Sequence, residues 1–155
     1  MEKQKYAAIV LAAGSGKRMN SKVHKQYLII QDRPVLYYSL KAFEDSAVDE
    51  IVLVVGKGEE EFCRKEIVDK YGISKVKAIV EGGKERYHSV FEGLKQTSDA
   101  DYVLIHDGAR PFVNRNHSTS SQKARCSPSR VSSSQRALLF SLYHAVIHCL
   151  PPLVL

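Results

Sequence analysis

Apolar residues along this chain gather in four short runs, and the segments between the runs have helical spacing. Val, Ile and Leu dominate the runs, and such continuous apolar stretches are typical of strands that are buried on both faces of a parallel sheet. We therefore expect four strands, at Tyr6–Leu11, Ile51–Val55, Val76–Val80 and Tyr102–His106.

Three helices are predicted between these strands. The first is expected at Pro34–Phe43, because proline suits the first turn of a helix, where its missing N–H would be unpaired anyway. The second starts at the acidic stretch Glu59–Glu61, continues with an apolar residue at every fourth position and stops at Gly72. The third is expected at Arg86–Gln96. Its predicted buried face comprises Tyr87, Val90, Phe91 and Leu94.

This alternation of strands and helices predicts an α/β fold of the Rossmann-like type. Right-handed crossovers would give a mostly parallel sheet that is covered by helices on both faces. Because the carboxyl ends of parallel strands meet at one edge of the sheet, a ligand is expected at that edge. The loops that follow the first, third and fourth strands are therefore the candidates for chemistry.

The loop after the first strand has the composition of a phosphate-binding loop. Glycines lack the Cβ atom that would keep a triphosphate away from the backbone, so successive N–H groups can point at its oxygens. Lysine and arginine side chains then add positive charge. The loop begins with Ala12, Ala13, Gly14, Ser15 and Gly16, and its cations are Lys17, Arg18, Lys22 and Lys25.

Two better-known phosphate loops are excluded by single residues. A P-loop requires glycine at the position of Leu11 and serine or threonine at the position of Arg18. The dinucleotide-binding fingerprint requires a third glycine at the position of Met19. The segment therefore indicates another kind of nucleotide-binding loop.

Two further loops are expected at the same edge of the sheet. After the third strand come Gly82 and Gly83, which permit the flat approach of a nucleobase, with the Ser89 hydroxyl available to read its edge. The fourth strand is followed by Asp107, and a carboxylate beside phosphates implies a divalent cation or a ribose hydroxyl. His106, which precedes it, is interpreted as a core histidine.

The α/β pattern stops at about Asn114. Residues 115–155 contain no Asp, Glu or Gly and nine serines, a composition that differs from that of an α/β domain. We therefore divide the chain into a nucleotide-binding domain at 1–114 and an atypical Ser/Arg-rich tail at 115–155. Two interpretations of the tail stay open: a flexible tail with a terminal apolar helix, or an out-of-frame or truncated carboxyl terminus.

The formal net charge of +6 does not indicate a nucleic-acid partner. All 17 acidic residues lie at or before Asp107, and residues 1–107 carry 17 lysines and arginines, so this part is neutral overall. Five of the six remaining basic residues fall in the tail, without interleaved aromatic residues. The three cysteines match neither a disulfide framework nor the spacing of zinc ligands. No signal peptide or membrane-spanning segment is expected, and the chain is predicted to be cytoplasmic.

Together, these loops resemble one known family, 2-C-methyl-D-erythritol 4-phosphate cytidylyltransferase of the non-mevalonate isoprenoid pathway. The resemblance covers residues 6–114 and is carried by AAGSGKRM at 12–19, KQY at 25–27, GGKERYHSV at 82–90 and HDGARPF at 106–112. It implies a nucleotidyltransferase that joins CTP to methylerythritol phosphate, a polyol phosphate, and releases pyrophosphate. It also implies magnesium as the metal and a homodimer as the usual assembly.

The resemblance further implies roles for single residues. Arg18 and Lys25 would stabilise the transition state, and the backbone at 12–16 would hold the triphosphate. Asp107 would lie near the ribose and the metal, and Arg110 would meet the acceptor phosphate. The residues expected around the rest of the nucleotide, cytosine included, are Gly82, Gly83, Lys84, Arg86 and Ser89.

The carboxyl-terminal part of the chain departs from the family. Family members continue well beyond the HDGARPF segment with residues that hold the acceptor, and no such residues are recognisable here. We therefore expect little or no turnover by this chain. Two alternatives stay open: a ribitol-5-phosphate cytidylyltransferase, which resembles the same loops, and an inactive nucleotide-binding fragment.

Overall fold

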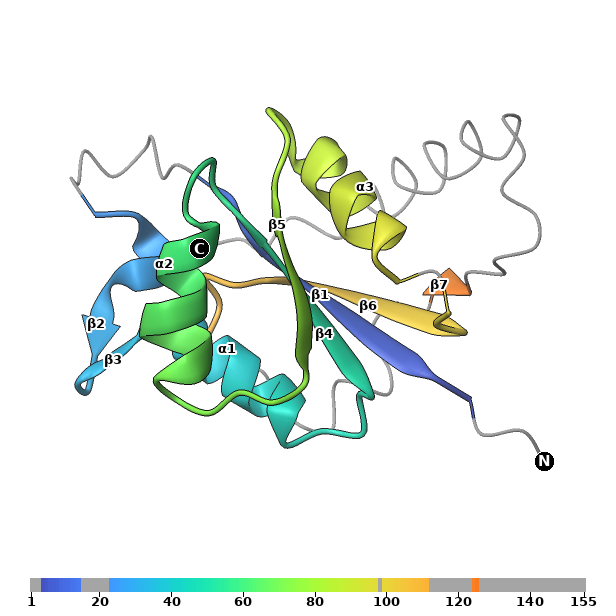
Figure 1. Ribbon diagram of the computed structural model, residues 1–155, viewed down its shortest axis with the longest axis horizontal. Coiled ribbons are helices and arrows are strands. Elements are labelled where there is room, and N and C mark those ends of the chain that lie inside the picture. Colours follow the sequence, from blue (N-terminus) through green and yellow to red (C-terminus); the bar gives the residue numbers. More distant parts are fainter. Residues whose placement is uncertain (1–3, 15–22, 98, 112–123, 126–155) are drawn as a thin grey trace, which may run out of the picture.

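The computed structural model describes residues 4–14, 23–97, 99–111 and 124–125. The strands of this part form a five-stranded sheet with the order β5-β4-β1-β6-β7 and a separate hairpin, β2-β3 (Figure 1). The bounds of the sheet strands are Tyr6–Ala12 for β1, Glu50–Val55 for β4, Val76–Glu81 for β5, Tyr102–Asp107 for β6 and Ala124–Arg125 for β7.

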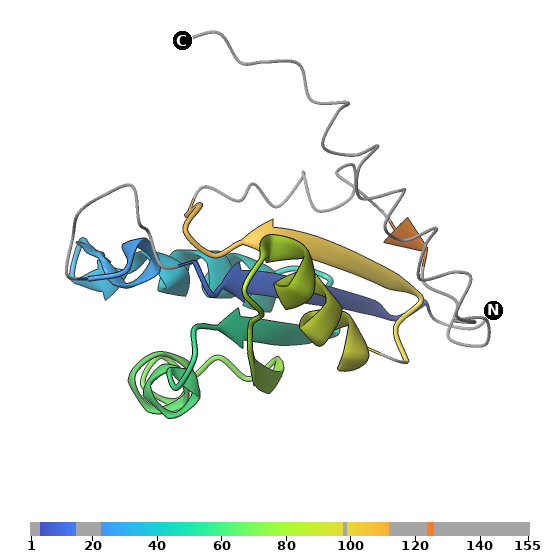
Figure 2. The same cartoon turned by 90° about the horizontal axis from the view of Figure 1, so that it is seen from above.

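The four long strands run parallel. Figure 2 shows β1, β4 and β6 ending at the same edge of the sheet. β1 is central, because Ala7 pairs with Glu50 of β4 on one side and with Val103 of β6 on the other. The four predicted strands and the mostly parallel α/β sheet are confirmed, and each strand is one residue longer than predicted. The sequence did not predict β7, a two-residue strand that pairs antiparallel with the start of β6.

Helices cover both faces of the sheet (Figure 1). α1 (Val35–Glu44) and α2 (Glu60–Cys63), which continues as the π-helix η3 (Arg64–Asp69), pack on one face. α3 (Arg86–Lys95) packs on the other face. Gly72, at φ 63°, follows the second helix as predicted. In the described ranges, no helix has the length and apolar character needed to cross a membrane.

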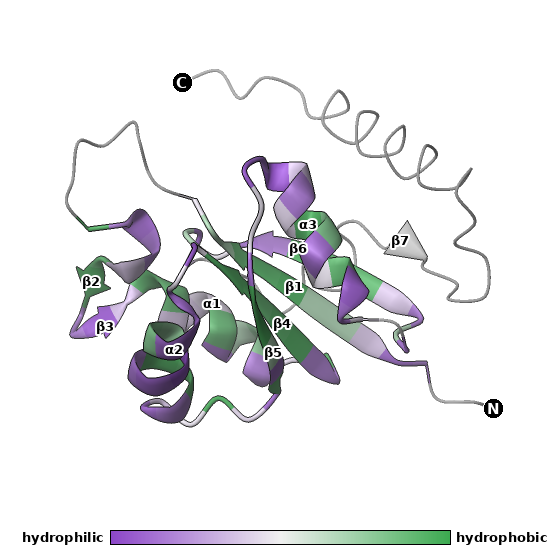
Figure 3. Cartoon of the chain, turned by 45° about the horizontal axis from the view of Figure 1, so that its top comes forward, coloured by the Kyte–Doolittle hydropathy of each residue, from purple (hydrophilic) through white to green (hydrophobic). Residues whose placement is uncertain are grey.

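The core explains why β1 reads as a continuous apolar run. Ala8 and Val10 belong to the core that the sheet forms with α1, whereas Ala7 and Ile9 belong to the core under α3. All four are fully buried, because successive residues of a strand point to opposite faces and both faces are covered. Figure 3 shows the resulting hydrophobic character along β1 and β4.

The buried face of α3 differs from the prediction. Ser89, Val90 and Gly93 are buried, whereas Tyr87 and Phe91 are 36% and 41% exposed. The physical reason is the close approach of the helix to the sheet, since a Cβ atom at Gly93 would lie 2.7 Å from Ile9 Cγ2. Small residues therefore face the sheet and the large aromatic rings stand beside it, so the predicted burial of Tyr87 and Phe91 was wrong.

Three short elements between β1 and α1 were not predicted. They are η2 (Lys25–Tyr27), β2 (Ile29–Ile30) and β3 (Arg33–Pro34). Gln31 and Asp32 connect the two strands at φ 48° and 64°, the left-handed conformation of a two-residue hairpin loop. Pro34 therefore ends a strand and immediately precedes α1, rather than lying in the first turn of the helix.

Candidate active site

A cavity of about 640 Å³ opens at the carboxyl edge of the sheet. The loops that follow β1 and β6 contribute to its wall, and these neighbouring strands lie where the order of the sheet reverses direction. In open α/β sheets this reversal leaves a crevice at the carboxyl ends of the strands, and ligands bind there. The architecture therefore places the cavity where the sequence predicted a ligand.

Most of the predicted site residues meet in this cavity. The first loop contributes Ala12, Ala13 and Gly14, and the η2 turn contributes Lys25. The loop after β5 contributes Gly83 and Lys84, and the start of α3 contributes Arg86 and Ser89. The loop at the end of β6 contributes Asp107 and Arg110. Ser15, Gly16 and Arg18 lie outside the described residues.

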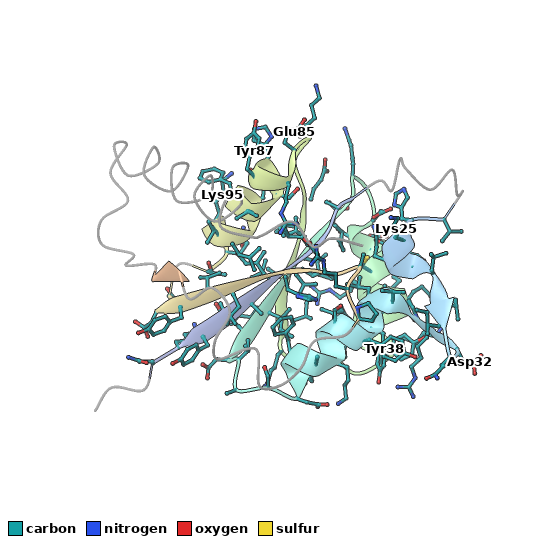
Figure 4. All side chains as sticks on the ribbon, turned by 180° about the vertical axis from the view of Figure 1, so that it is seen from behind. Lys25, Asp32, Tyr38, Glu85, Tyr87 and Lys95 are labelled. Carbon is teal, nitrogen blue, oxygen red and sulfur yellow. The ribbon has the colours of Figure 1, made fainter. Side chains whose placement is uncertain are left out.

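Among the predicted site residues that the structure describes, Gly82 is the one that does not line the cavity. Its N–H donates a hydrogen bond of 2.8 Å to the carbonyl of Val55, which continues the pairing of β4 with β5. Its neighbour Gly83 does line the cavity, beside Lys84. Figure 4 labels the side chains of Glu85 and Lys25, which come from two different parts of the chain. Glu85 lies at the start of α3, and Lys25 lies on η2.

The first loop is held at its base by Gln26. This side chain is buried, and its amide donates hydrogen bonds to the carbonyls of Ala12 (2.6 Å) and Gly14 (3.4 Å). In contrast, apart from Gly14 and its two chain neighbours, no atom in the described part of the chain lies within 4 Å of the position that a Cβ atom of Gly14 would take. The backbone at Gly14 is therefore fixed from behind and open toward the cavity. Sequence analysis missed Gln26, although it stands in the KQY segment.

Asp107 lies between two arginines. Arg86 donates to one carboxylate oxygen, and Arg110 Nε lies 3.3 Å from the other. Among the described residues of the cavity wall, positive side chains outnumber negative ones, which favours an anionic ligand. The cations are Lys25, Lys84, Arg86 and Arg110, and the carboxylates are Glu85 and Asp107.

The loop that carries Asp107 is supported by two polar side chains from beneath. The buried Ser39 hydroxyl donates to the carbonyls of Gly108 (3.2 Å) and Arg110 (3.0 Å). His106 is partly buried, packs against the ring of Phe43 and donates from Nε2 to the Arg110 carbonyl at 3.0 Å. Burial lowers the pKa of His106, so the neutral imidazole is the form that supports the loop. Sequence analysis missed Ser39.

Carboxylates are the side chains of the described cavity wall that could bind a metal ion. No group of three His, Cys, Asp or Glu side chains is arranged there to hold a metal ion. A magnesium ion commonly takes one or two carboxylates and completes its shell with water and substrate phosphates. Asp107 in the cavity wall fits this arrangement, in which the nucleotide brings most of the ligands.

Comparison with known proteins decides the family. The family model for 2-C-methyl-D-erythritol 4-phosphate cytidylyltransferase matches residues 6–129. The chain belongs to this family. The resemblance inferred from the loops is thereby confirmed, and the match runs past residue 114, where the sequence alone had placed its end. The division into domains at residue 114 stays a prediction.

Curated and solved relatives support membership of the 2-C-methyl-D-erythritol 4-phosphate cytidylyltransferase family. The chain is 58% identical over 113 residues to the enzyme of that name from Lachnoclostridium phytofermentans, covering 73% of this chain and 48% of the relative. It is similar to the crystal structure of 4-diphosphocytidyl-2C-methyl-D-erythritol synthase from Anaerococcus prevotii at 33% identity and a TM-score of 0.62, covering 76% of this chain and 49% of that one. The chain spans about half the length of the curated relatives it matches.

Proposed function

We propose that this chain forms the CTP-binding half of a cytidylyltransferase acting on 2-C-methyl-D-erythritol 4-phosphate. The products would be 4-diphosphocytidyl-2-C-methyl-D-erythritol, a precursor of isoprenoids, and pyrophosphate. The observation that carries the proposal is the convergence of three loops, after β1, β5 and β6, on one cavity with an excess of positive charge. Membership of the family supports this assignment over other nucleotidyltransferases.

The cavity offers a place for each part of CTP. The triphosphate would lie on the backbone at 12–16, where Gly14 exposes its main chain. Cytosine would lie against Gly83 and Lys84, with Ser89 near the start of α3 lining the same cavity. Asp107 would lie near the ribose.

The reaction needs positioning and charge rather than a side-chain nucleophile. An oxygen of the acceptor phosphate attacks the α-phosphorus of CTP in line, and the bond to the bridging oxygen of pyrophosphate breaks. Lys25 and Arg18 would stabilise the negative charge that builds on these oxygens. A magnesium ion bound by Asp107 and the phosphates would supply further positive charge. Arg110, on the same loop, would attract the acceptor phosphate.

The homodimer that the family resemblance implies is part of this proposal. Titration calorimetry of the 155-residue protein tests the nucleotide half directly. We expect selective binding of CTP over ATP, strengthened by magnesium. Equal affinity for both nucleotides, with and without magnesium, would contradict the assignment of the loop at 82–89 to base recognition. A pyrophosphate-release assay with methylerythritol phosphate, and with ribitol 5-phosphate for comparison, tests the acceptor.

A further inference from the structure

Lys25 lies on η2, a single 3₁₀ turn of three residues outside the main helices and the sheet. A cation that stabilises a transition state must be held in place before the reaction, because ordering it during the reaction costs free energy. The structure shows what holds it. Gln26 ties the turn to the first loop through its two amide hydrogen bonds, and a second attachment ties it to the end of β4.

The second attachment is the carboxylate of Glu59, just before α2. Its Oε1 lies 2.9 Å from Nδ1 of His24, and its Oε2 accepts a hydrogen bond of 2.7 Å from the hydroxyl of Tyr27. The same Oε2 accepts a 3.1 Å hydrogen bond from the backbone N–H of Gly56. One carboxylate therefore binds the residue before Lys25, the last residue of its turn and the loop after β4.

The backbone at Gly56 is shaped for this carboxylate. A Cβ atom at Gly56 would lie 2.7 Å from Oε2 of Glu59, a distance that leaves no room for a side chain. A side chain at position 56 would therefore displace the Glu59 carboxylate from its observed position.

The protonation states make Tyr27 a donor. Burial raises the pKa of Tyr27 well above its ordinary value, and its hydrogen bond to Glu59 raises it further. Burial likewise raises the pKa of the Cys63 thiol to about 11. Both groups are therefore protonated at neutral pH. The Tyr27 hydroxyl donates to Glu59, and the Cys63 thiol, 3.1 Å away, donates to the Tyr27 oxygen.

We propose that Glu59 is a positioning residue for Lys25: it fastens the η2 turn through His24 and Tyr27, so that the ammonium group is presented to the phosphates of the nucleotide. The phosphate role of Lys25 rests on the proposed function. The fastening of the turn does not, and it can be measured without a ligand.

Amide hydrogen exchange of the ligand-free protein tests the fastening. The turn is closed by hydrogen bonds from the N–H groups of Tyr27 and Leu28 to the carbonyls of His24 and Lys25. We expect Glu59→Ala to speed exchange at both amides by about tenfold or more, while the Gly82 amide stays protected. Glu61→Ala, at an exposed position of α2 two residues after Glu59, is the matched control and should leave both amides unchanged.

Tyr27→Phe provides a second variant in case Glu59→Ala does not fold. It removes the hydroxyl and keeps the ring, which packs edge-on against Phe62. We expect Tyr27→Phe to speed amide exchange in the η2 turn, as Glu59→Ala does. Glu59→Gln should keep more protection than Glu59→Ala, since its amide oxygen still accepts from Tyr27.

A double-mutant cycle tests whether Glu59 acts through Lys25. Glu59→Ala should weaken CTP binding by about tenfold and leave cytidine, which carries no phosphate, unaffected. In the Lys25→Ala background the same substitution should have little further effect, because the group that it positions is already absent.

The outcomes separate the two proposals. Unchanged exchange at Tyr27 and Leu28 in a folded Glu59 variant would overturn the fastening. Additive losses in the cycle, or equal losses for CTP and cytidine, would make Glu59 a purely structural residue. If the unsubstituted protein does not bind CTP although exchange responds as expected, the proposed function fails and the fastening of the turn stands.

Discussion

Gly82 lies directly against Ala13, since a Cβ atom at Gly82 would stand 2.4 Å from the Cβ of Ala13. The same atom would stand 2.7 Å from the hydroxyl of Ser89. The loop after β5 therefore packs on the loop after β1 where no side chain fits. Gly14, one residue beyond Ala13, has open space instead, as far as the described residues show. One glycine is required by the packing of the loops, and the other is free to serve a ligand.

We expect Gly14→Ala and Gly82→Ala to separate stability from binding. Gly82→Ala should lower the free energy of unfolding by about 1–3 kcal/mol through overpacking. Gly14→Ala should change it by no more than about 0.5 kcal/mol, yet weaken CTP binding by about tenfold, because its methyl group keeps phosphate oxygens from the backbone. Urea unfolding and calorimetry measure the two effects. A Gly14→Ala protein that binds CTP normally would remove Gly14 from the phosphate site.

Asp107→Asn should change CTP binding in two opposite ways. Without magnesium, removing a negative charge between Arg86 and Arg110 should strengthen CTP binding by about tenfold. The strengthening of binding by magnesium should be lost with the carboxylate. Calorimetry with and without magnesium measures both. Glu85→Gln, at the other carboxylate of the cavity wall, is the control and should keep the magnesium effect. A magnesium effect that survives in Asp107→Asn would place the metal elsewhere.

The free energy of unfolding should decrease when the pH falls below 6.5, the ordinary pKa of histidine, because of His106. Its pKa is lowered in the folded state by burial, so between the lowered value and 6.5 the unfolded chain binds the proton more readily. Stability from this group is therefore fully present above pH 6.5 and is lost as the pH falls through that range. Urea midpoints as a function of pH should show the loss, and His106→Gln should reduce it. An exposed-site control, His88→Gln, should leave the slope as it is.

Gly93→Ala tests the orientation of α3. If the predicted face were buried, alanine at position 93 would stabilise the helix by up to about 1 kcal/mol, because its helix propensity is higher. In the observed packing the new methyl group meets Ile9, and we expect a loss of about 1–3 kcal/mol in the free energy of unfolding. The two orientations thus predict opposite signs, which urea unfolding distinguishes.

The strands could be predicted from the sequence because their signal is local. Val52 and Val54 face one side of the sheet and Ile51 and Leu53 the other, and all are buried, so the run is apolar without interruption. The order of the loops along the chain then places the cavity at the carboxyl edge by topology alone. For the same reason the glycine loops and Asp107 could be assigned to one site from the sequence.

The supporting residues could not be predicted in this way. Gln26, Ser39 and Glu59 act on backbone or side chains that are distant in sequence, and no local pattern marks their partners. The prediction of the buried face of α3 failed for a related reason. Helical spacing favoured the aromatic residues as the buried face, whereas the close packing of Gly93 on the sheet decided the rotation of the helix.

The central place of β1 has a consequence for folding during synthesis. Its partners β4 and β6 lie far apart along the chain, and the pairing of Ala7 with Val103 spans most of the described residues. Until β6 has left the ribosome, an apolar edge of β1 has no neighbour, and such edges promote aggregation. Long-range pairing of this kind also slows folding. The nascent chain therefore stays exposed to misassembly until the strand that ends at Asp107 emerges and completes the cavity.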